Sequence, residues 1–549
     1  MRADKIEQAS AVAEKIRKII VRYNSTRLSR VRDDPGAMWD EVRRLTGVVR
    51  CKTYPENINA ASLNNHYCAI STDPSYLAPN RKQLASRDDY TGLVSEFSVF
   101  NLLDKLSPTA SGPDGLPFWF LKLAAPIICE SLTHVINLSL ATSIVPRQWK
   151  SAIIHPIPKI AQPVEPSQMR PISVVSILSR LTERLVIRNF INPEISTCFD
   201  LSNQYAYQAT CSTTAALVSI LSNITQLLLT NSHVHVLTFD YSKAFDTLSH
   251  SVVADTLSYL SASDEIYNWV LDYLSERSHA TLFQGSMSSF ATITAGVIQG
   301  SVLGPTLFNI TSSTLTPFST INKYFKYADD GYLIVPASNA HTIPHELLHH
   351  AAWASQRNLK LNISKTAEIV FARKRSSAPP PSPGIERVNS LKILGVLVDD
   401  HLTFQEHISQ TIKSCSQSLF ALRTMRQHGL DNKSLIQIFS SKILSKITYA
   451  VPAWWGFASN TSKLQLESFL RKAIKFNYYP ENQLNIEQIV ESIEYKLFQS
   501  IVNNPGHSLH LLLPSKKQVH YDLRKRGHDF SLPTRDTSNF IIRCLYKYV

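Results

Sequence analysis

Three aspartates, in two separate segments of the chain, are the residues best suited to metal chemistry. Asp329 and Asp330 lie in KYFKYADDGYLIVP, residues 323–336, and Asp240 lies in HVHVLTFDYSKAFDTLSH, residues 233–250. Carboxylate oxygens from separate rigid elements can bind two Mg²⁺ ions roughly 3.5–4 Å apart, one activating an attacking oxygen and one holding a leaving phosphate. These residue types in this pattern therefore fit two-metal phosphoryl chemistry.

A hairpin and a strand end must position these carboxylates. Strand formers on both sides of an Asp-Gly pair predict a β-hairpin with Asp329 and Asp330 at its water-facing tip. Asp240 ends a run of β formers and should lie where a buried strand emerges. Each segment alone also fits an ordinary structure, a surface turn in one case and a helix N-cap in the other. Their combination favours the functional interpretation.

Several blocks occur in the order and spacing of a known family. FDYSKAFD, GVIQGSVLGP and YADD resemble the reverse transcriptases, specifically those of LINE-type non-LTR retrotransposons. Further matching blocks are SGPDGLPFWFLK (111–122), HPIPK (155–159), RPISVVSILSRLTERLV (170–186), LNISKT (361–366) and LKILGVLVDDHLTF (391–404). The resemblance covers about residues 100–405. We expect the family's upstream endonuclease region to be absent, so that the chain would prime only on nicks made by another protein.

The resemblance implies an α+β right-hand polymerase fold, with a palm built on an antiparallel sheet, fingers and a helical thumb. Residues 1–95 would form a basic helical extension or linker, 96–405 the fingers and palm, 406–480 the thumb, and 481–549 a basic C-terminal region. Apolar residues at helical spacing between Ile408 and Leu422 agree with the thumb assignment. We expect Trp454 and Trp455 to lie in the core rather than to stack on bases.

The family's metal ligands map onto the three aspartates. Asp240 and Asp329 would be the shared ligands, and Asp330 a weaker ligand or a hydrogen-bond organiser. Two Mg²⁺ ions would be the cofactor, with Mn²⁺ as a possible substitute. Adjacent carboxylates raise each other's pKa unless cations intervene, which also suits a metal site. Asp246 should instead be structural and cap the next helix.

The resemblance further assigns a set of residues to nucleotide binding. Lys159 and Arg170 would grip the triphosphate, Phe245 would exclude a 2′-hydroxyl, and Lys365 would act as general acid to pyrophosphate. The glycine-rich turn around Gln299 would let the backbone approach a base or sugar. The complete set is Lys159, Arg170, Tyr241, Phe245, Gln299, Gly300 and Lys365. Without the resemblance, the cations fit solvated surface charges and Phe245 fits a core residue.

Two departures from the family pattern keep other functions open. Ile298 stands where the family usually has proline, and residues 311–320, TSSTLTPFST, replace an aliphatic stretch that usually has an acidic end. A catalytically inactive, reverse-transcriptase-like RNA-binding scaffold or a decayed element copy is therefore the alternative. A maturase-like splicing helper is a third candidate, and its RNA binding would survive loss of the carboxylates.

Composition limits the partners. The chain has 56 Lys and Arg against 43 Asp and Glu, a net charge of +13, and a pI near 9.3, which favours a polyanion or an anionic membrane surface. No uninterrupted apolar run approaches the roughly 18–20 residues of a membrane span, and the N-terminus is too charged for a secretory signal. Seven cysteines without a CxxC pair indicate neither a zinc knuckle nor a disulfide scaffold.

We therefore expect an intracellular protein, nuclear or cytoplasmic, with no membrane partner. Its expected partners are an RNA template, a DNA primer or target, and deoxynucleoside triphosphates. Its oligomeric state is left open. The charge of residues 523–530, LRKRGHDF, is the one indication of nucleic-acid binding near the C-terminus.

Overall fold

A five-stranded sheet in the order β12-β11-β3-β9-β8 forms the centre of the molecule. Its strands are β3 (His233–Phe239), β8 (Lys323–Tyr327), β9 (Asp330–Pro336), β11 (Ala367–Ala372) and β12 (Glu386–Arg387). Four strands pair antiparallel, and the short edge strand β12 joins β11 in parallel. The computed structural model describes residues 2–31, 35–46, 54–84, 94–373, 379–480, 482–516 and 528–548. The predicted α+β fold with an antiparallel palm sheet is confirmed.

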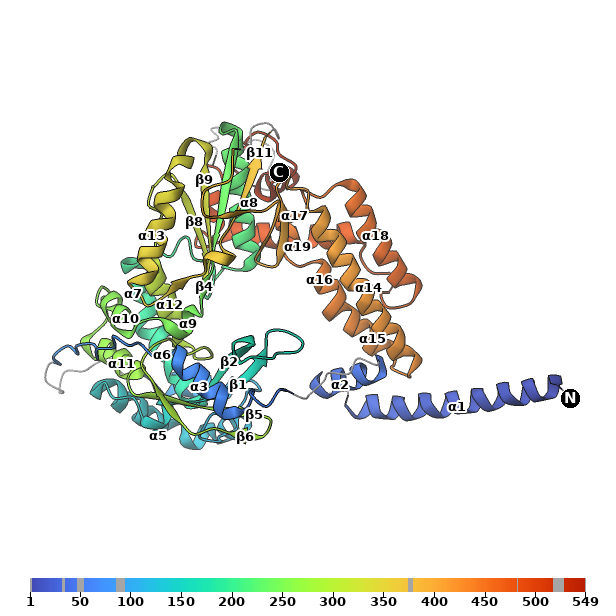
Figure 1. Ribbon diagram of the computed structural model, residues 1–549, viewed down its shortest axis with the longest axis horizontal. Helices are drawn as coiled ribbons and strands as arrows, with labels where there is room; N and C mark the ends of the chain where they lie inside the picture. Colours follow the sequence, from blue (N-terminus) through green and yellow to red (C-terminus); the bar gives the residue numbers. More distant parts are fainter. Residues whose placement is uncertain are drawn as a thin grey trace.

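Side-chain alternation along the strands gives this sheet two apolar faces. Val234 and Val236 of β3 pack into one core with α8 (Thr213–Thr230), whereas Leu237 and Phe239 pack into another with α12 (Leu303–Ser313) and α13 (Ile343–Ser355). Figure 1 shows α8 and α13 beside the palm strands. The sheet is therefore buried on both faces and holds its strand ends rigidly.

A second sheet lies in the fingers. It contains β1 (Ser151–Pro158), β2 (Met169–Val175), β5 (Arg277–Phe283), β6 (Ser286–Met287) and β7 (Ala291–Ile293). β1 pairs antiparallel with β2 and parallel with β5. The helices of this half of the molecule are α3 (Ala60–Ile70), α4 (Glu96–Asp104), α5 (Phe118–Thr142), α6 (Ile177–Val186), α7 (Asn192–Cys198), α9 (Ala244–Thr247), α10 (His250–Leu257) and α11 (Asp264–Leu274).

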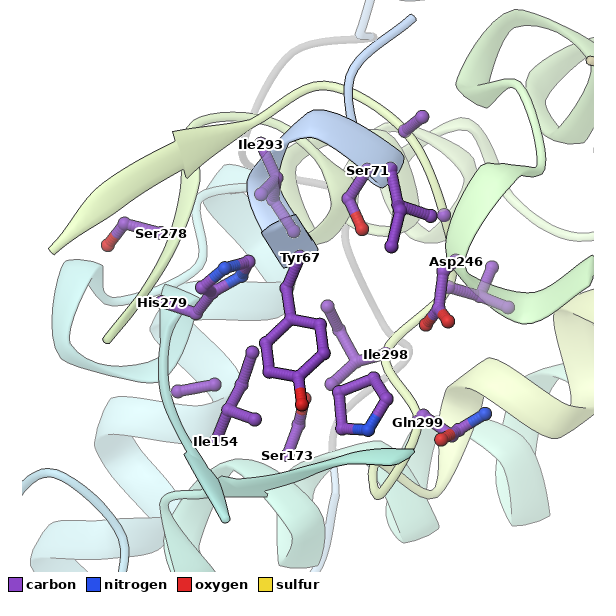
Figure 2. Close-up of a pocket in the computed structure, with 16 residues that line it drawn as sticks. Tyr67, Ser71, Ile154, Ser173, Asp246, Ser278, His279, Ile293, Ile298 and Gln299 are labelled. Atoms are coloured by element: carbon purple, nitrogen blue, oxygen red, sulfur yellow. The ribbon is translucent and has the colours of Figure 1, made fainter. Parts of the chain in front are cut away.

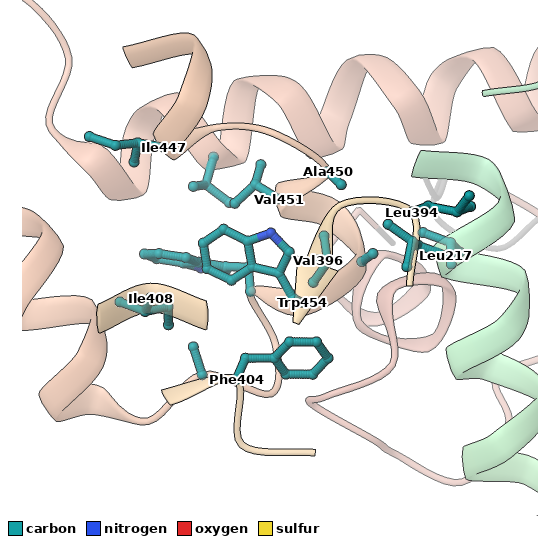
Figure 3. Packing of buried hydrophobic residues seen from close by; sticks show 14 of the residues in the cluster. Leu217, Leu394, Val396, Phe404, Ile408, Ile447, Ala450, Val451 and Trp454 are labelled. Atoms are coloured by element: carbon teal, nitrogen blue, oxygen red, sulfur yellow. The ribbon is translucent and has the colours of Figure 1, made fainter. Parts of the chain in front are cut away.

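Helices make up the thumb and the described C-terminal residues. They are α14 (Gln405–Gln427), α15 (Asn432–Ile438), α16 (Ser445–Ile447), α17 (Val451–Trp454), α18 (Asn460–Lys475), α19 (Ile486–Asn503) and α20 (Phe540–Lys547). The hairpin of β13 (Ser390–Ile393) and β14 (Val396–Asp399) precedes them. Trp454 is 2% and Trp455 7% exposed, and Figure 3 shows Trp454 among Phe404, Ile408 and Val451. The tryptophan pair is a core feature, as expected.

The core that contains these tryptophans also includes residues of α8, α19 and α20. The domain boundaries given above stay a prediction. Most of segment 523–530 lies outside the described residues.

The N-terminal extension contacts both the thumb and the fingers. The helix α1 (Arg2–Arg30) meets the thumb where Asn24 Nδ2 lies 2.8 Å from His428 Nδ1, and α2 (Pro35–Thr46) packs on α14. The next described helix, α3, packs instead on β5 and β7 of the fingers. In Figure 1, α1 projects away from the rest of the molecule, α2 lies near the thumb helices and α3 lies beside the sheet of the fingers.

Two of the described helices, α5 and α8, are long and apolar enough to cross a membrane. Their most apolar windows are 39% and 50% buried, respectively. Core helices can have the same length and composition, so this is weak support for a membrane span.

Candidate active site

The expected hairpin of β8 and β9 is present, and Tyr327 pairs with Asp330 across its end. The turn differs from the expectation, because Ala328 and Asp329 form it while Asp330 and Gly331 belong to β9. A Cβ on Gly331 would lie 2.1 Å from the Tyr324 hydroxyl. Close packing inside the hairpin therefore accounts for this glycine.

The three aspartates come together at the end of the palm sheet. Asp240 directly follows Phe239, which pairs with Gly331 of the hairpin. Burial and the charge of Asp240 raise the pKa of Asp329. Burial, Asp329 and Asp240 together raise the pKa of Asp330 to about 6. The carboxylates are thus close enough to repel one another.

This donor set fits a divalent cation by its chemistry. All three side chains offer hard oxygen ligands on rigid elements, and a cation would relieve their repulsion. Lys365 Nζ lies 3.1 Å from Asp240 Oδ2, and Asn362 Nδ2 donates to the same oxygen at 3.3 Å. Among the described residues, no group of three or more His, Cys, Asp or Glu is already spaced to hold a metal ion.

Cations from the fingers face these carboxylates. Arg170 lies on β2 opposite Ile157, and Lys159 directly follows β1. Burial, Arg170 and Lys365 lower the pKa of Lys159, and the charge of Arg170 favours the ionised form of Asp329. Lys159, Arg170 and Lys365 therefore surround the same space as the acids. All three side chains belong to residues that remain exposed.

The glycine-rich turn approaches β2 so closely that it needs glycine. Gly300 has φ +133°, and a Cβ there would lie 2.0 Å from the Ser173 carbonyl oxygen. The Ser173 amide donates to the Gln299 carbonyl at 2.9 Å. The turn therefore joins the palm to the fingers strand that carries Arg170.

Two other residues that were predicted to bind the nucleotide lie mainly in the core. Phe245 is 8% exposed and stacks on Phe308 at 4.5 Å between ring centroids. Tyr241 is 5% exposed and packs on Trp353 at 5.9 Å. Phe245 borders the site, whereas the Tyr241 side chain is not brought together with the charged residues. A nucleotide contact by either residue stays a prediction.

Asp246 differs from its expected role. It lies within α9, and the N-cap of the following helix α10 is Ser249, so Asp246 is not a cap. Figure 2 shows its carboxylate at a cavity of about 30 Å³ that Tyr67 enters from α3 and that Gln299 also lines. Burial raises the pKa of Asp246 to about 6 against the opposing charges of Lys243 and Lys159.

The structure brings several further residues to the site that the sequence did not single out. Lys243 adds a further exposed cation, and Tyr207 is 62% exposed with its ring 6.4 Å from that of Phe245. Tyr67 belongs to an N-terminal helix far along the chain from the matching blocks. Lys243 lies within the block FDYSKAFD, next to the residues that were singled out, whereas Tyr67 and Tyr207 carry no local pattern and reach the site through tertiary contacts.

Comparison with known proteins agrees with the resemblance. Residues 157–398 match the family model "Reverse transcriptase (RNA-dependent DNA polymerase)". The probable RNA-directed DNA polymerase from transposon BS of Drosophila melanogaster is 26% identical, over 63% of this chain and 40% of that protein. The enzyme from mobile element jockey of the same organism is 28% identical, over 57% and 36%. Residues 157–398 are thus similar to reverse transcriptases, and these curated relatives are RNA-directed DNA polymerases of mobile elements, in agreement with the resemblance to retrotransposon enzymes.

The chain spans about two fifths of the length of these curated relatives. A Pol polyprotein of the R2 retrotransposable element from Popillia japonica is 26% identical, over 52% of this chain and 40% of that protein. Among solved structures, apo telomerase from Candida tropicalis aligns with a TM-score of 0.35 and 15% identity, over 70% of this chain and 72% of that one. This structural similarity is too weak to support an inference.

Proposed function

We propose that this chain is an RNA-directed DNA polymerase, which adds deoxynucleotides to a primer 3′-hydroxyl on an RNA template during retrotransposition. The proposal rests on one observation: three carboxylates of the palm lie close to three cationic side chains, and two of these cations come from the fingers. Such a site can bind metal ions on one side and a triphosphate on the other. The names of the similar proteins support this choice of reaction.

Each charged residue has a role in this reaction. Asp240 and Asp329 would hold two Mg²⁺ ions, and Asp330 would assist them. When bound, the ions supply activation of the primer hydroxyl and stabilisation of charge on the leaving pyrophosphate. Arg170 grips the triphosphate with its planar fork, and Lys159 adds a point charge. Lys365, whose Nζ lies 3.1 Å from Asp240 Oδ2, would donate a proton to the leaving pyrophosphate.

Nucleotide choice would depend on Phe245 and the turn around Gln299. The exposed edge of Phe245 would meet the sugar and exclude a 2′-hydroxyl. The glycines bring the backbone of the turn close to the nucleotide. We further propose an RNA template and a DNA primer as partners, and an intracellular site of action, in agreement with the net charge of +13.

The departure at Ile298 is compatible with an intact site. Ile298 is 6% exposed and packs with Ala152, Val175 and Ile293, so the turn rests on apolar side chains beside the small cavity described above. This packing does not favour the inactive scaffold over the enzyme. A measurement of primer extension distinguishes a polymerase from an inactive RNA-binding scaffold.

Extension of one DNA primer on matched RNA and DNA templates tests the proposal. Purified full-length protein receives Mg²⁺ and either deoxynucleotides or ribonucleotides. We expect extension on RNA with deoxynucleotides. Tight RNA binding without extension would overturn the polymerase proposal and leave the scaffold function.

A further inference from the structure

A segment outside the charged site holds the catalytic hairpin in place. Residues 203–206 run alongside β8, where the Lys326 amide donates to the Asn203 carbonyl at 2.7 Å and the Tyr205 amide donates to the Lys326 carbonyl at 2.8 Å. Gln204 lies between these two bonds and is 1% exposed. Its side chain is therefore directed at the hairpin from a fixed backbone.

Both polar groups of the Ala328 backbone bond to the Gln204 side chain. The Ala328 amide donates to Gln204 Oε1 at 3.0 Å, and Gln204 Nε2 donates to the Ala328 carbonyl at 3.4 Å. The Ala206 amide also donates to Oε1 at 3.0 Å, which orients the Gln204 carboxamide. One side chain thus fixes the peptide position directly before Asp329.

Ala328 needs such support because its backbone is in the left-handed region. Its φ is +55°, where a residue with a Cβ is strained. Relaxation of this residue to negative φ would rotate the next peptide and move Asp329 away from Asp240. The bonds from Gln204 oppose this relaxation.

We propose that Gln204 is a positioning residue for the reaction proposed above, because it holds Ala328 in the left-handed conformation and so directs Asp329 toward Asp240. The inference rests on the proposed function. Gln204 touches neither a nucleotide nor a metal ion in this account. Supporting groups of this kind affect metal affinity and rate through the ligand that they orient.

The chain offers a matched control in the same segment. Gln208 Nε2 donates to the Leu201 carbonyl at 3.1 Å and to the Gln204 carbonyl, and none of its bonds reaches the hairpin. Methionine keeps the length of glutamine without its hydrogen bonds. Gln204→Met and Gln208→Met therefore both weaken the segment, but only the first releases Ala328.

The experiment compares these variants by activity and by metal binding. For Gln204→Met we expect kcat to fall about 100-fold, with the KM for deoxynucleotide changed by less than about threefold. We also expect the dissociation constant for Mn²⁺, measured without nucleic acid by the paramagnetic resonance signal of free Mn²⁺, to rise at least about tenfold. Gln208→Met should stay within about threefold of the wild type in each measurement.

A double variant tests the conformational step. Glycine adopts positive φ without a Cβ penalty. The double variant Gln204→Met with Ala328→Gly should therefore have a kcat at least about tenfold higher than that of Gln204→Met alone. If Gln204→Met does not fold, Gln204→Asn, which keeps the amide but shortens its reach, replaces it in the same comparison.

Equal losses in the Gln204 and Gln208 variants, or unchanged Mn²⁺ affinity in Gln204→Met, would overturn the inference. Absence of primer extension by the wild type would instead overturn the proposed function. The Mn²⁺ comparison still decides the role of Gln204 in that case, so the two failures are distinguishable.

Discussion

At the scale of single residues, Phe245 combines a core contact with a position at the edge of the site. Its ring stacks on Phe308 at 4.5 Å, and only 8% of the residue is exposed. This packing would make the exposed edge a rigid wall. A rigid wall excludes a 2′-hydroxyl better than a mobile one, because it cannot move aside.

Phe245→Val should therefore admit ribonucleotides. We expect the ratio of kcat/KM for a deoxynucleotide to that for the matching ribonucleotide to fall at least about tenfold, which corresponds to about 1.4 kcal/mol. Single-nucleotide incorporation on an RNA template measures both values. Phe308→Leu loosens the stack but keeps the Phe245 ring, so it should lower this ratio by less than Phe245→Val does. An equal fall in both variants would contradict a gate formed by Phe245 itself.

At the scale of elements, a buried ionic network joins three strands of the palm sheet. Glu368 of β11 is fully buried, accepts bonds from Arg387 of β12 and Ser382, and lies 2.7 Å from Nδ1 of His235 on β3. Burial alone would raise the pKa of Glu368, but these three partners lower it to about 2. The network therefore stabilises the sheet while Glu368 is ionised.

Glu368→Gln should lower the free energy of unfolding by about 3 kcal/mol at neutral pH, because it leaves the largely buried guanidinium of Arg387 without its carboxylate partner. The folded pKa, about 2, lies below the ordinary value of 4.5, so the contribution is complete above pH 4.5 and is lost as the pH falls toward 2. Urea unfolding at several pH values measures this difference. The exposed Glu386→Gln on β12 is the control, and a difference that grows with acidity would contradict the network.

The elements also show what could be predicted from sequence. Strand formers around Asp240 and the YADD segment predicted both the strand end and the hairpin, because local periodicity determines them. The turn lies at Ala328 and Asp329, directly before the Asp-Gly pair, and Gly331 packs against Tyr324 inside the hairpin, a contact that the Asp-Gly pattern does not encode. Gln204 was missed because its partner is 124 residues away and nothing local marks the pair.

At the scale of the whole molecule, an excess of positive charge accompanies an acidic site. The net charge of +13 belongs to a chain whose predicted catalytic centre contains three aspartates. Because Lys159, Arg170 and Lys365 balance the charge of these aspartates, the excess of positive charge belongs to the rest of the chain. A basic surface around such a centre suits a protein that holds nucleic acid while metal ions occupy the acids.

Binding to an RNA–DNA hybrid should consequently be strongly salt-dependent. If the protein neutralises six or more phosphates, its affinity should fall at least about 1,000-fold between 50 and 200 mM salt, because binding releases counterions from the nucleic acid. Fluorescence anisotropy of a labelled hybrid at several salt concentrations measures the effect. A change of less than about threefold would contradict an extended phosphate-binding surface.

The most direct test of the central claim is one-nucleotide extension of a DNA primer on an RNA template by Asp329→Asn. This variant keeps the size of the side chain and removes its charge, and Asp255→Asn, which alters an exposed carboxylate on α10, is the control. We predict that Asp329→Asn loses at least about 100- to 1,000-fold in rate, while hybrid binding and the control stay within about threefold of the wild type. An Asp329→Asn rate within about threefold of the wild type would contradict the assignment of catalysis to this site.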